Sequence, residues 1–235
     1  MPQPDAAPHP PPAPALPLQG LTLLLVEDSR AASDVMRLMA QRSGARLRRA
    51  DTLHEARRHL ARYRPDIVLV DLGLPDGSGL ALIRDMAAEG PAAPVAIAVS
   101  GDPGLADAAR AAGAAAFLAK PLPGLAAVQQ LLIGHLTGHW PPAPEDLPLP
   151  SPDPLALHED LARAADLLHQ WGEDVTALHY LAGFLAGIAR TAGDRALEDA
   201  ARNMGDGAPG SRAGLRALLA ARLRAGPPPL AAGLG

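Results

Sequence analysis

The fold is decided by the stretch Val68-Leu69-Val70-Asp71-Leu72-Gly73-Leu74-Pro75-Asp76-Gly77. A short apolar run here ends in one carboxylate, and a loop rich in glycine and proline follows at once. Apolar runs of this length are typical of strands that are buried on both faces of a parallel sheet. Side chains at the carboxyl ends of such strands point into the crevice where ligands bind. Because a lone carboxylate is costly to desolvate, we expect Asp71 to have a functional role or a partner.

The sequence on both sides of this stretch alternates between strand-like and helix-like patterns. Strands are predicted at 21–26, 45–50, 67–70, 94–99 and 115–119, and helices at 29–42, 52–63, 79–89, 103–112 and 123–135. Five strand–helix units in succession predict an α/β domain with a five-stranded, parallel, doubly wound sheet. The run at 45–50 is the most polar of the five, so we expect it near an edge of the sheet.

Composition divides the rest of the chain. We expect a disordered, proline-rich leader at 1–19, the α/β domain at 20–136, a semi-rigid proline-rich linker at 137–154, a small all-α module at 155–226 and a flexible tail at 227–235. Helical periodicity in the module covers 155–171, 174–192, 194–203 and 211–225. A module of this size is marginal as an independent core, so pairing with itself or with the first domain would stabilise it.

Composition also excludes several classes of protein. The 235 residues carry a formal net charge of −4, which gives no global attraction to nucleic acid or to an anionic membrane. The chain has no cysteine, so disulfides and thiolate metal sites are excluded, and a reducing compartment fits. We see no signal peptide and no apolar run long enough to span a membrane, and we expect a cytoplasmic protein.

Polar residues follow four of the predicted strands and converge at one end of the sheet. They are Glu27 and Asp28, Asp71, Ser100, and Lys120, which is the only lysine of the chain. Three carboxylates close together repel one another unless a cation lies among them, and hard oxygen ligands suit Mg²⁺ or Mn²⁺. Lys120 and Ser100 would neutralise or hydrogen-bond the oxygens of an incoming phosphoryl group. A nucleophile, a metal clamp, a cation and a donor are what phosphoryl transfer to a carboxylate needs.

With these motifs the sequence resembles the CheY-like receiver domain of two-component response regulators over about residues 20–135. The resemblance is carried by Glu27-Asp28, Asp71 with its Leu74–Gly77 loop, Ser100-Gly101 and Lys120-Pro121. It implies a flavodoxin/CheY-like fold with Asp71 as phosphoacceptor, and a sensor histidine kinase or phosphotransfer protein as partner. The implied metal ligands are Glu27, Asp28, Asp71 and the backbone carbonyl of Gly73. No enzyme activity is expected beyond self-phosphorylation and self-dephosphorylation.

The resemblance also implies a switch formed by Ser100 and Phe117, which lies three residues before Lys120. Phenylalanine lacks the hydroxyl of tyrosine, so packing alone would fix its inward state. A lone aromatic beside a strand is also explained by ordinary core packing. We expect phosphorylation of Asp71 to shift this side of the domain and to change how the C-terminal helices pack.

The helical module is expected to signal by contact with a downstream protein or by homodimerisation. Residues 155–235 hold eight Arg and no Lys against nine Asp and Glu, so the basic face of a DNA-binding domain is missing. A transcriptional regulator is therefore the last of the alternatives, and it would bind DNA with a steep salt dependence. A metal-dependent phosphatase would need a second Asp two residues after the nucleophile, where this chain has Gly73.

Another alternative is a phosphorelay intermediate that passes phosphate between Asp71 and His179. The segment His179-Tyr180-Leu181-Ala182-Gly183 resembles the His-x-Leu-x-Gly core of histidine phosphotransfer domains, although that family usually has Lys where this chain has Ala182. The simpler interpretation is that His179 is an ordinary boundary residue and that the small residues beside it form a helix-packing surface.

Overall fold

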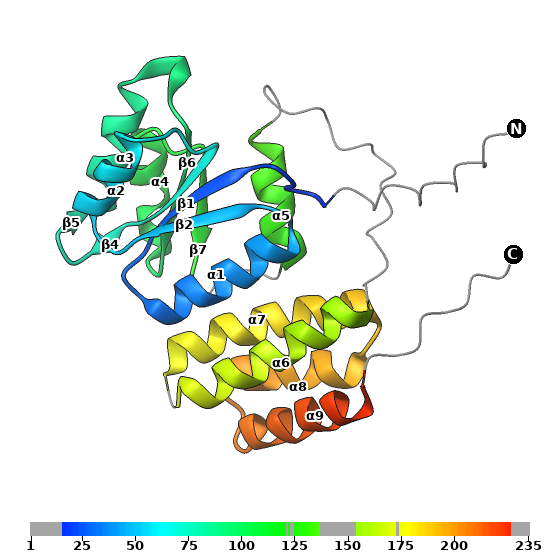
Figure 1. Cartoon of the computed structure of the whole chain (residues 1–235). Helices are drawn as coiled ribbons and strands as arrows, with labels where there is room; N and C mark the ends of the chain where they lie inside the picture. The colour runs from blue at the N-terminus through cyan, green and yellow to red at the C-terminus, as the bar shows by residue number, and fades with distance from the viewer. Residues whose placement is uncertain (1–15, 121, 123–124, 137–153, 173, 227–235) are drawn as a thin grey trace, which may run out of the picture.

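A five-stranded parallel sheet lies at the centre of the first domain of the computed structural model (Figure 1). The structure describes residues 16–120, 122, 125–136, 154–172 and 174–226. The strands run in the order β2-β1-β3-β6-β7, with bounds β1 Thr22–Val26, β2 Arg46–Ala50, β3 Ile67–Asp71, β6 Val95–Ser100 and β7 Ala116–Ala119. This is a doubly wound order: the chain goes from β1 to β2 on one side and then crosses back to β3, β6 and β7 on the other, while all five strands stay parallel. The predicted α/β class is confirmed, and the polar strand β2 is at an edge.

Five helices cover the two faces of this sheet. They are α1 Arg30–Arg42, α2 Leu53–Leu60, α3 Gly79–Ala87, α4 Ala106–Ala111 and α5 Leu125–Gly134. Apolar residues of α1 and α5 share one core with alternate strand residues, and those of α2, α3 and α4 share a second core with the others. The period-2 alternation of side chains along each strand produces these two faces.

Short polar side chains cap the N-termini of three of these helices. The hydroxyls of Ser29, Thr52 and Ser78 accept hydrogen bonds from backbone N–H groups in the first turns of α1, α2 and α3. The predicted helix at 103–112 is shorter than expected, because Pro103–Leu105 forms a 3-10 turn before α4 begins. Between β3 and α3, where the sequence predicts a loop, Gly73–Leu74 (β4) and Gly77–Ser78 (β5) pair as a small antiparallel ribbon.

The leader predicted at 1–19 is partly wrong. Residues 16–19 form a turn that packs on the C-terminal end of α1: Leu18 is buried, and its N–H donates to the carbonyl of Ser43 at 2.7 Å. One leucine that buries its side chain anchors this segment despite its proline-rich surroundings. The rest of the predicted leader, the linker through residue 153 and the tail at 227–235 lie outside the described residues.

Four helices form the C-terminal module, as the periodicity predicted. They are α6 Pro154–Gln170, α7 Val175–Ala192, α8 Arg195–Gly205 and α9 Ser211–Ala225. None of the helices in the described part of the chain is long and apolar enough to cross a membrane.

The module packs on the α1/α5 face of the first domain. Helix α7 lies between α1 and the other helices of the module and also contacts α5 (Figure 1). The apolar core that lies beneath α1 and α5 continues without a break into the module. At the edge of this contact Arg42 of α1 forms an ion pair with Asp160 of α6. The first domain therefore supplies part of the core that the small module lacks by itself.

Candidate functional site

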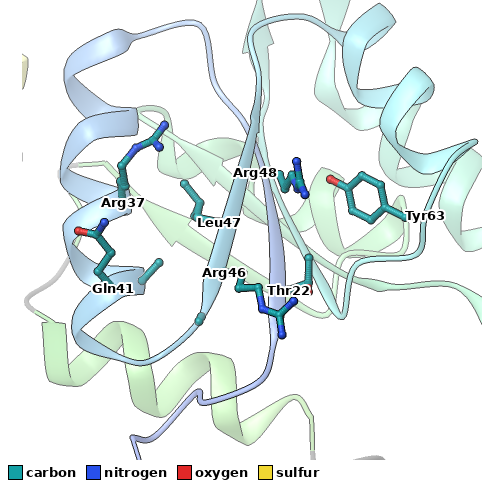
Figure 2. Close-up of a pocket in the computed structure, with 9 residues that line it drawn as sticks. Thr22, Arg37, Gln41, Arg46, Leu47, Arg48 and Tyr63 are labelled. Carbon is teal, nitrogen blue, oxygen red and sulfur yellow. The ribbon is translucent and has the colours of Figure 1, made fainter.

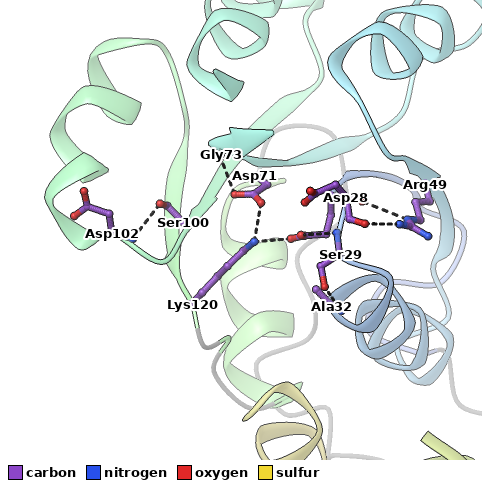
Figure 3. A network of polar contacts seen from close by, with 10 residues as sticks. Asp28, Ser29, Ala32, Arg49, Asp71, Gly73, Ser100, Asp102 and Lys120 are labelled. Atoms are coloured by element: carbon purple, nitrogen blue, oxygen red, sulfur yellow. Dashed lines mark hydrogen bonds and ion pairs between the residues drawn. The ribbon is translucent and has the colours of Figure 1, made fainter. Parts of the chain in front are cut away.

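Charged residues from three strands of the sheet meet at its carboxyl edge (Figure 3). Glu27 and Asp28 directly follow β1, Asp71 is the last residue of β3, and Lys120 directly follows β7. Strands β1, β3 and β7 run parallel, so these residues emerge at one edge although they are far apart in sequence.

The ammonium group of Lys120 lies between two buried carboxylates. Its Nζ is 2.7 Å from Oε2 of Glu27 and 2.8 Å from Oδ2 of Asp71. Burial alone would lower the pKa of Lys120, but the hydrogen bonds to Asp71 and Glu27 outweigh that effect and raise the pKa above its ordinary value. Burial raises the pKa of Glu27, and the bond from Lys120 opposes this rise. Lys120 is therefore held as a cation against the carboxylates.

The three carboxylates are close enough to share one metal ion. Each of Glu27, Asp28 and Asp71 offers an oxygen, and these oxygens all lie within 4.8 Å of one another. Asp28 is exposed, whereas the other two are buried. A set of hard, negatively charged oxygens with one side open to water is the ligand set that Mg²⁺ prefers, so the residues present fit this ion.

Arg49 of β2 fixes the backbone of the acidic pair. Its Nη2 donates to the carbonyl oxygen of Asp28 at 2.9 Å, and its Nε donates to that of Glu27 at 3.3 Å (Figure 3). Sequence reasoning missed this role. The signal that could have found it is the position of Arg49 near the end of an edge strand that neighbours β1.

The loop after Asp71 is held from both sides. The N–H of Gly73 donates to Oδ1 of Asp71 at 3.1 Å, and the carboxylate of Asp76 accepts from the backbone N–H groups of Leu53 and His54 at 2.9 and 3.0 Å. The bond from Leu53 is the main cause that lowers the pKa of Asp76. At Gly79 a Cβ atom would lie 2.1 Å from the carbonyl oxygen of Asp71, so only glycine permits α3 to begin this close to β3.

Ser100 and Phe117, the predicted switch pair, differ in their surroundings. Ser100 is buried at the end of β6, and its hydroxyl accepts a hydrogen bond from the N–H of Asp102 at 3.1 Å. Phe117 is half-buried and packs on the core shared by α2, α3 and α4. The helical module contacts the opposite face, through α1 and α5. The expected route from Phe117 to the packing of the C-terminal helices would therefore have to cross the sheet.

Two adjacent residues of α7 point in different directions. His179 is half-buried and faces α8, because a Cβ on Gly205 would lie 4.0 Å from its Cδ2 atom. Tyr180 is 1% exposed and lies within electrostatic reach of Lys120, Glu27 and Asp71. The structure thus places Tyr180, rather than His179, on the side of the acidic cluster. Sequence reasoning missed Tyr180, although apolar residues on every side of α7 are typical of a helix that is buried all round.

A separate open hollow lies away from this cluster, between α1 and the edge strand β2 (Figure 2). Its charged residues are Arg37, Arg46 and Arg48, and the guanidinium carbon of Arg48 lies 5.9 Å from the centroid of the Tyr63 ring. Basic side chains along an edge strand hinder its pairing with another chain. The basic residues of this hollow are therefore explained by protection of the edge strand, without a ligand.

Comparison with known proteins agrees with this geometry. Residues 23–131 match the family of response regulator receiver domains. The KDP operon transcriptional regulatory protein KdpE of Escherichia coli (strain K12) is 31% identical over 155 residues, which cover 65% of each chain. The virulence transcriptional regulatory protein PhoP of Salmonella typhimurium (strain LT2) is 41% identical over 64 residues, which cover 27% of this chain and 29% of PhoP. The matched part thus covers less than two thirds of either relative.

Among solved structures, a CheY-like response regulator receiver domain from Methylobacillus flagellatus is 27% identical, with a TM-score of 0.45, and the match covers 50% of this chain and 98% of that one. The family match and the KdpE relative together show that residues 23–131 form a receiver domain of the two-component response regulator family.

Proposed function

We propose that Asp71 accepts a phosphoryl group from a sensor histidine kinase, a phosphotransfer protein or a small acyl phosphate. The observation that carries this proposal is the pair of bonds from Lys120 to Asp71 and Glu27 at the edge of the sheet. A carboxylate oxygen of Asp71 attacks phosphorus and forms a new P–O bond. The donor's P–N or P–O bond breaks, and its electron pair leaves with the donor. Hydrolysis by water releases inorganic phosphate and restores the carboxylate, and we propose no other enzymatic activity.

The residues around Asp71 divide the remaining tasks. Lys120 neutralises charge on the phosphoryl oxygens, and the hydroxyl of Ser100 donates to one of them. Ser100 and Phe117 then report the modified state on the face of the sheet that α2, α3 and α4 cover. In this proposal the bond that now joins Lys120 to Asp71 rearranges when the phosphoryl group arrives.

A divalent cation completes the site. Glu27, Asp28 and Asp71 would hold Mg²⁺ or Mn²⁺, together with the backbone carbonyl of Gly73. The bound ion supplies positive charge that offsets the repulsion between the carboxylates and the phosphoryl oxygens. The three carboxylate oxygens within 4.8 Å of one another support this assignment.

The helical module is proposed to signal by contact with a downstream protein or with a second copy of the chain. The excess of acidic over basic residues in 155–235 supports protein contact over DNA binding. A mass measurement of the oligomer with and without beryllofluoride tests self-association, and a salt titration with DNA tests the transcriptional alternative. For the relay alternative, transfer from phosphorylated Asp71 is measured in His179→Ala; unchanged transfer eliminates it.

The phosphoacceptor is tested by intact-mass measurement after incubation with acetyl phosphate and Mg²⁺. Wild type should gain one phosphoryl group, which chelation of the metal should prevent. Asp71→Ala should gain none, whereas Asp85→Ala, which removes an exposed carboxylate of α3, should behave as wild type. A phosphoryl group that persists in Asp71→Ala would overturn the assignment.

A further inference from the structure

Tyr180 has a buried hydroxyl whose proton has no acceptor among the described residues. The side chain is 1% exposed, and its oxygen is fully buried with no partner of standard geometry among the described residues. A buried hydroxyl that donates to nothing destabilises the fold by the cost of its desolvation. Such a group in a native structure calls for a specific explanation.

The neighbours of this hydroxyl are the charged groups of the receiver site. Burial raises the pKa of Tyr180, the charge of Lys120 and a polar contact of its ammonium with the hydroxyl oxygen oppose the rise, and Glu27 and Asp71 add to it. The hydroxyl therefore keeps its proton and remains a donor at neutral pH. Lys120 lies near enough to influence it, but the two short bonds of the ammonium go to Glu27 and Asp71.

The close approach of α7 to the receiver holds Tyr180 in this position. Gly183 lies one turn further along α7, on the same side as Tyr180. A Cβ at Gly183 would lie 3.2 Å from the carbonyl oxygen of Leu122, two residues after Lys120. The absence of a side chain at Gly183 thus lets α7 pack against the segment that carries Lys120. Ala182, the residue before Gly183, faces α8 instead, and its Cβ lies 3.2 Å from a Cβ placed on Gly205.

Among the described module residues with a shifted pKa, Tyr180 is the one whose shift has Lys120, Glu27 and Asp71 among its causes. Phe117, the other candidate reporter of the site, packs on the opposite face of the sheet, against the core shared by α2, α3 and α4. Tyr180 therefore offers α7 a direct link to the state of Asp71.

We propose that Tyr180 is a positioning residue of the phosphoryl site, contributed by the helical module. When Asp71 is phosphorylated, the Tyr180 hydroxyl donates a hydrogen bond to a phosphoryl oxygen. This bond satisfies the orphan donor, retains the phosphoryl group and ties α7 to the modified receiver. The inference rests on the proposed role of Asp71, and it extends the site beyond the residues of the receiver itself.

The test uses the full chain and beryllofluoride with Mg²⁺ as a mimic of the phosphoryl group. Calorimetric titration of Tyr180→Phe should show binding about tenfold weaker than wild type, because one hydrogen bond to a charged acceptor is lost. The lifetime of the acyl phosphate formed from acetyl phosphate should shorten by a similar factor. Tyr63→Phe is the matched control. It removes the only other tyrosine hydroxyl, which is also buried without a partner but lies beside Arg48.

A spectroscopic measurement separates a bond to the phosphoryl group from a structural effect of the variant. In Tyr63→Phe the only remaining tyrosine is Tyr180, so beryllofluoride should change its near-UV absorption through the new hydrogen bond. This measurement needs no change at Tyr180, so it remains decisive if Tyr180→Phe folds poorly.

A failure of the proposed role of Tyr180 can be distinguished from a failure of the proposed role of Asp71. If wild type neither binds beryllofluoride nor forms an acyl phosphate, the proposed role of Asp71 fails and the inference fails with it. If wild type does both, while Tyr180→Phe matches it in affinity and lifetime and the tyrosine spectrum of Tyr63→Phe stays unchanged, the role of Tyr180 alone is overturned.

Discussion

The only lysine of the chain, Lys120, bonds to Asp71 at 2.8 Å across the end of the sheet. Because the same ammonium also bonds to Glu27 at 2.7 Å, one cation balances two buried carboxylates. Removing one member of such a buried group leaves an uncompensated charge where water cannot solvate it well. The free-energy cost of that charge is larger than the net stabilisation that the ion pair provides.

Lys120→Met should therefore lower the free energy of unfolding by about 2–3 kcal/mol at pH 7. Urea denaturation without divalent cations measures this loss, and millimolar Mg²⁺ should recover part of it by binding the same carboxylates. Arg110→Met is the control: it breaks an exposed pair with Asp107, whose stabilising effect we expect to stay under about 1 kcal/mol. Equal losses in the two variants would contradict the assigned role of Lys120.

The glycine that begins α3 is predicted to be irreplaceable. In Gly79→Ala the new Cβ would meet the carbonyl oxygen of Asp71 at 2.1 Å and the Cγ1 atom of Val70 at 2.8 Å. Backbone must move to relieve this, so we expect a loss of about 2–4 kcal/mol in thermal or urea unfolding. Gly73→Ala serves as a control in the same loop, since nothing lies within 4 Å of its Cβ. Equal stability of the two variants would show that α3 can shift without cost.

Much of this architecture is predictable because its signals are local. Strand β3 is a continuous apolar run, and its position in the centre of the sheet follows from burial on both faces. The ribbon of β4 and β5 was not predicted, because strands of two residues leave no periodic signal.

Contacts between segments far apart in the chain could not be predicted from the sequence. Periodicity places Phe117 and Leu118 on opposite faces of β7, but it does not say which face a second domain covers. Periodicity likewise does not distinguish Tyr180 from the apolar residues of its helix. Its relation to Lys120 depends on how α7 packs across α1 and α5.

The contact between the two domains should depend on pH through Asp160. Burial raises the pKa of this carboxyl to about 6, and the ion pair with Arg42 only partly opposes the rise. The unfolded chain releases the same proton near 3.8, so between these values the folded state binds more protons. Stability must then increase as the pH falls from 7 towards 4.

Asp160→Asn should remove this contribution, which we expect to be about 1–3 kcal/mol across that range. Urea unfolding at several pH values measures it as the difference between variant and wild type. Asp166→Asn, an exposed position on the same helix, should leave the pH profile unchanged. If the free energy of unfolding of Asp160→Asn depends on pH as that of wild type does, the pH dependence comes from other groups.

Asp194 should stabilise the module with the opposite dependence on pH. Its carboxylate accepts a hydrogen bond from the N–H of Leu197 at the start of α8 and two from Arg222 of α9, at 2.7 and 3.1 Å. The bonds from Arg222 are the main cause that lowers the pKa of Asp194. Its contribution is therefore complete above the ordinary pKa of 3.8 and is lost as the pH falls through the lowered value. At pH 7 Asp194→Ala should cost about 1–2 kcal/mol, whereas Asp199→Ala, exposed on α8, should cost much less.

The last prediction concerns Gly183, where α7 meets the receiver. In a helix interior glycine is less favourable than alanine by about 1 kcal/mol, so Gly→Ala normally stabilises. Gly214 of α9 has nothing within 4 Å of its Cβ, and Gly214→Ala should raise the free energy of unfolding by about that amount. At Gly183 the new Cβ would lie 3.2 Å from the carbonyl oxygen of Leu122, and a backbone oxygen does not swing aside as a flexible side chain does. Gly183→Ala should therefore gain nothing, and Gly183→Leu should displace α7 and split urea unfolding into two transitions. A single transition in Gly183→Leu, together with a gain in Gly183→Ala equal to that of Gly214→Ala, would show that the two domains do not depend on this contact.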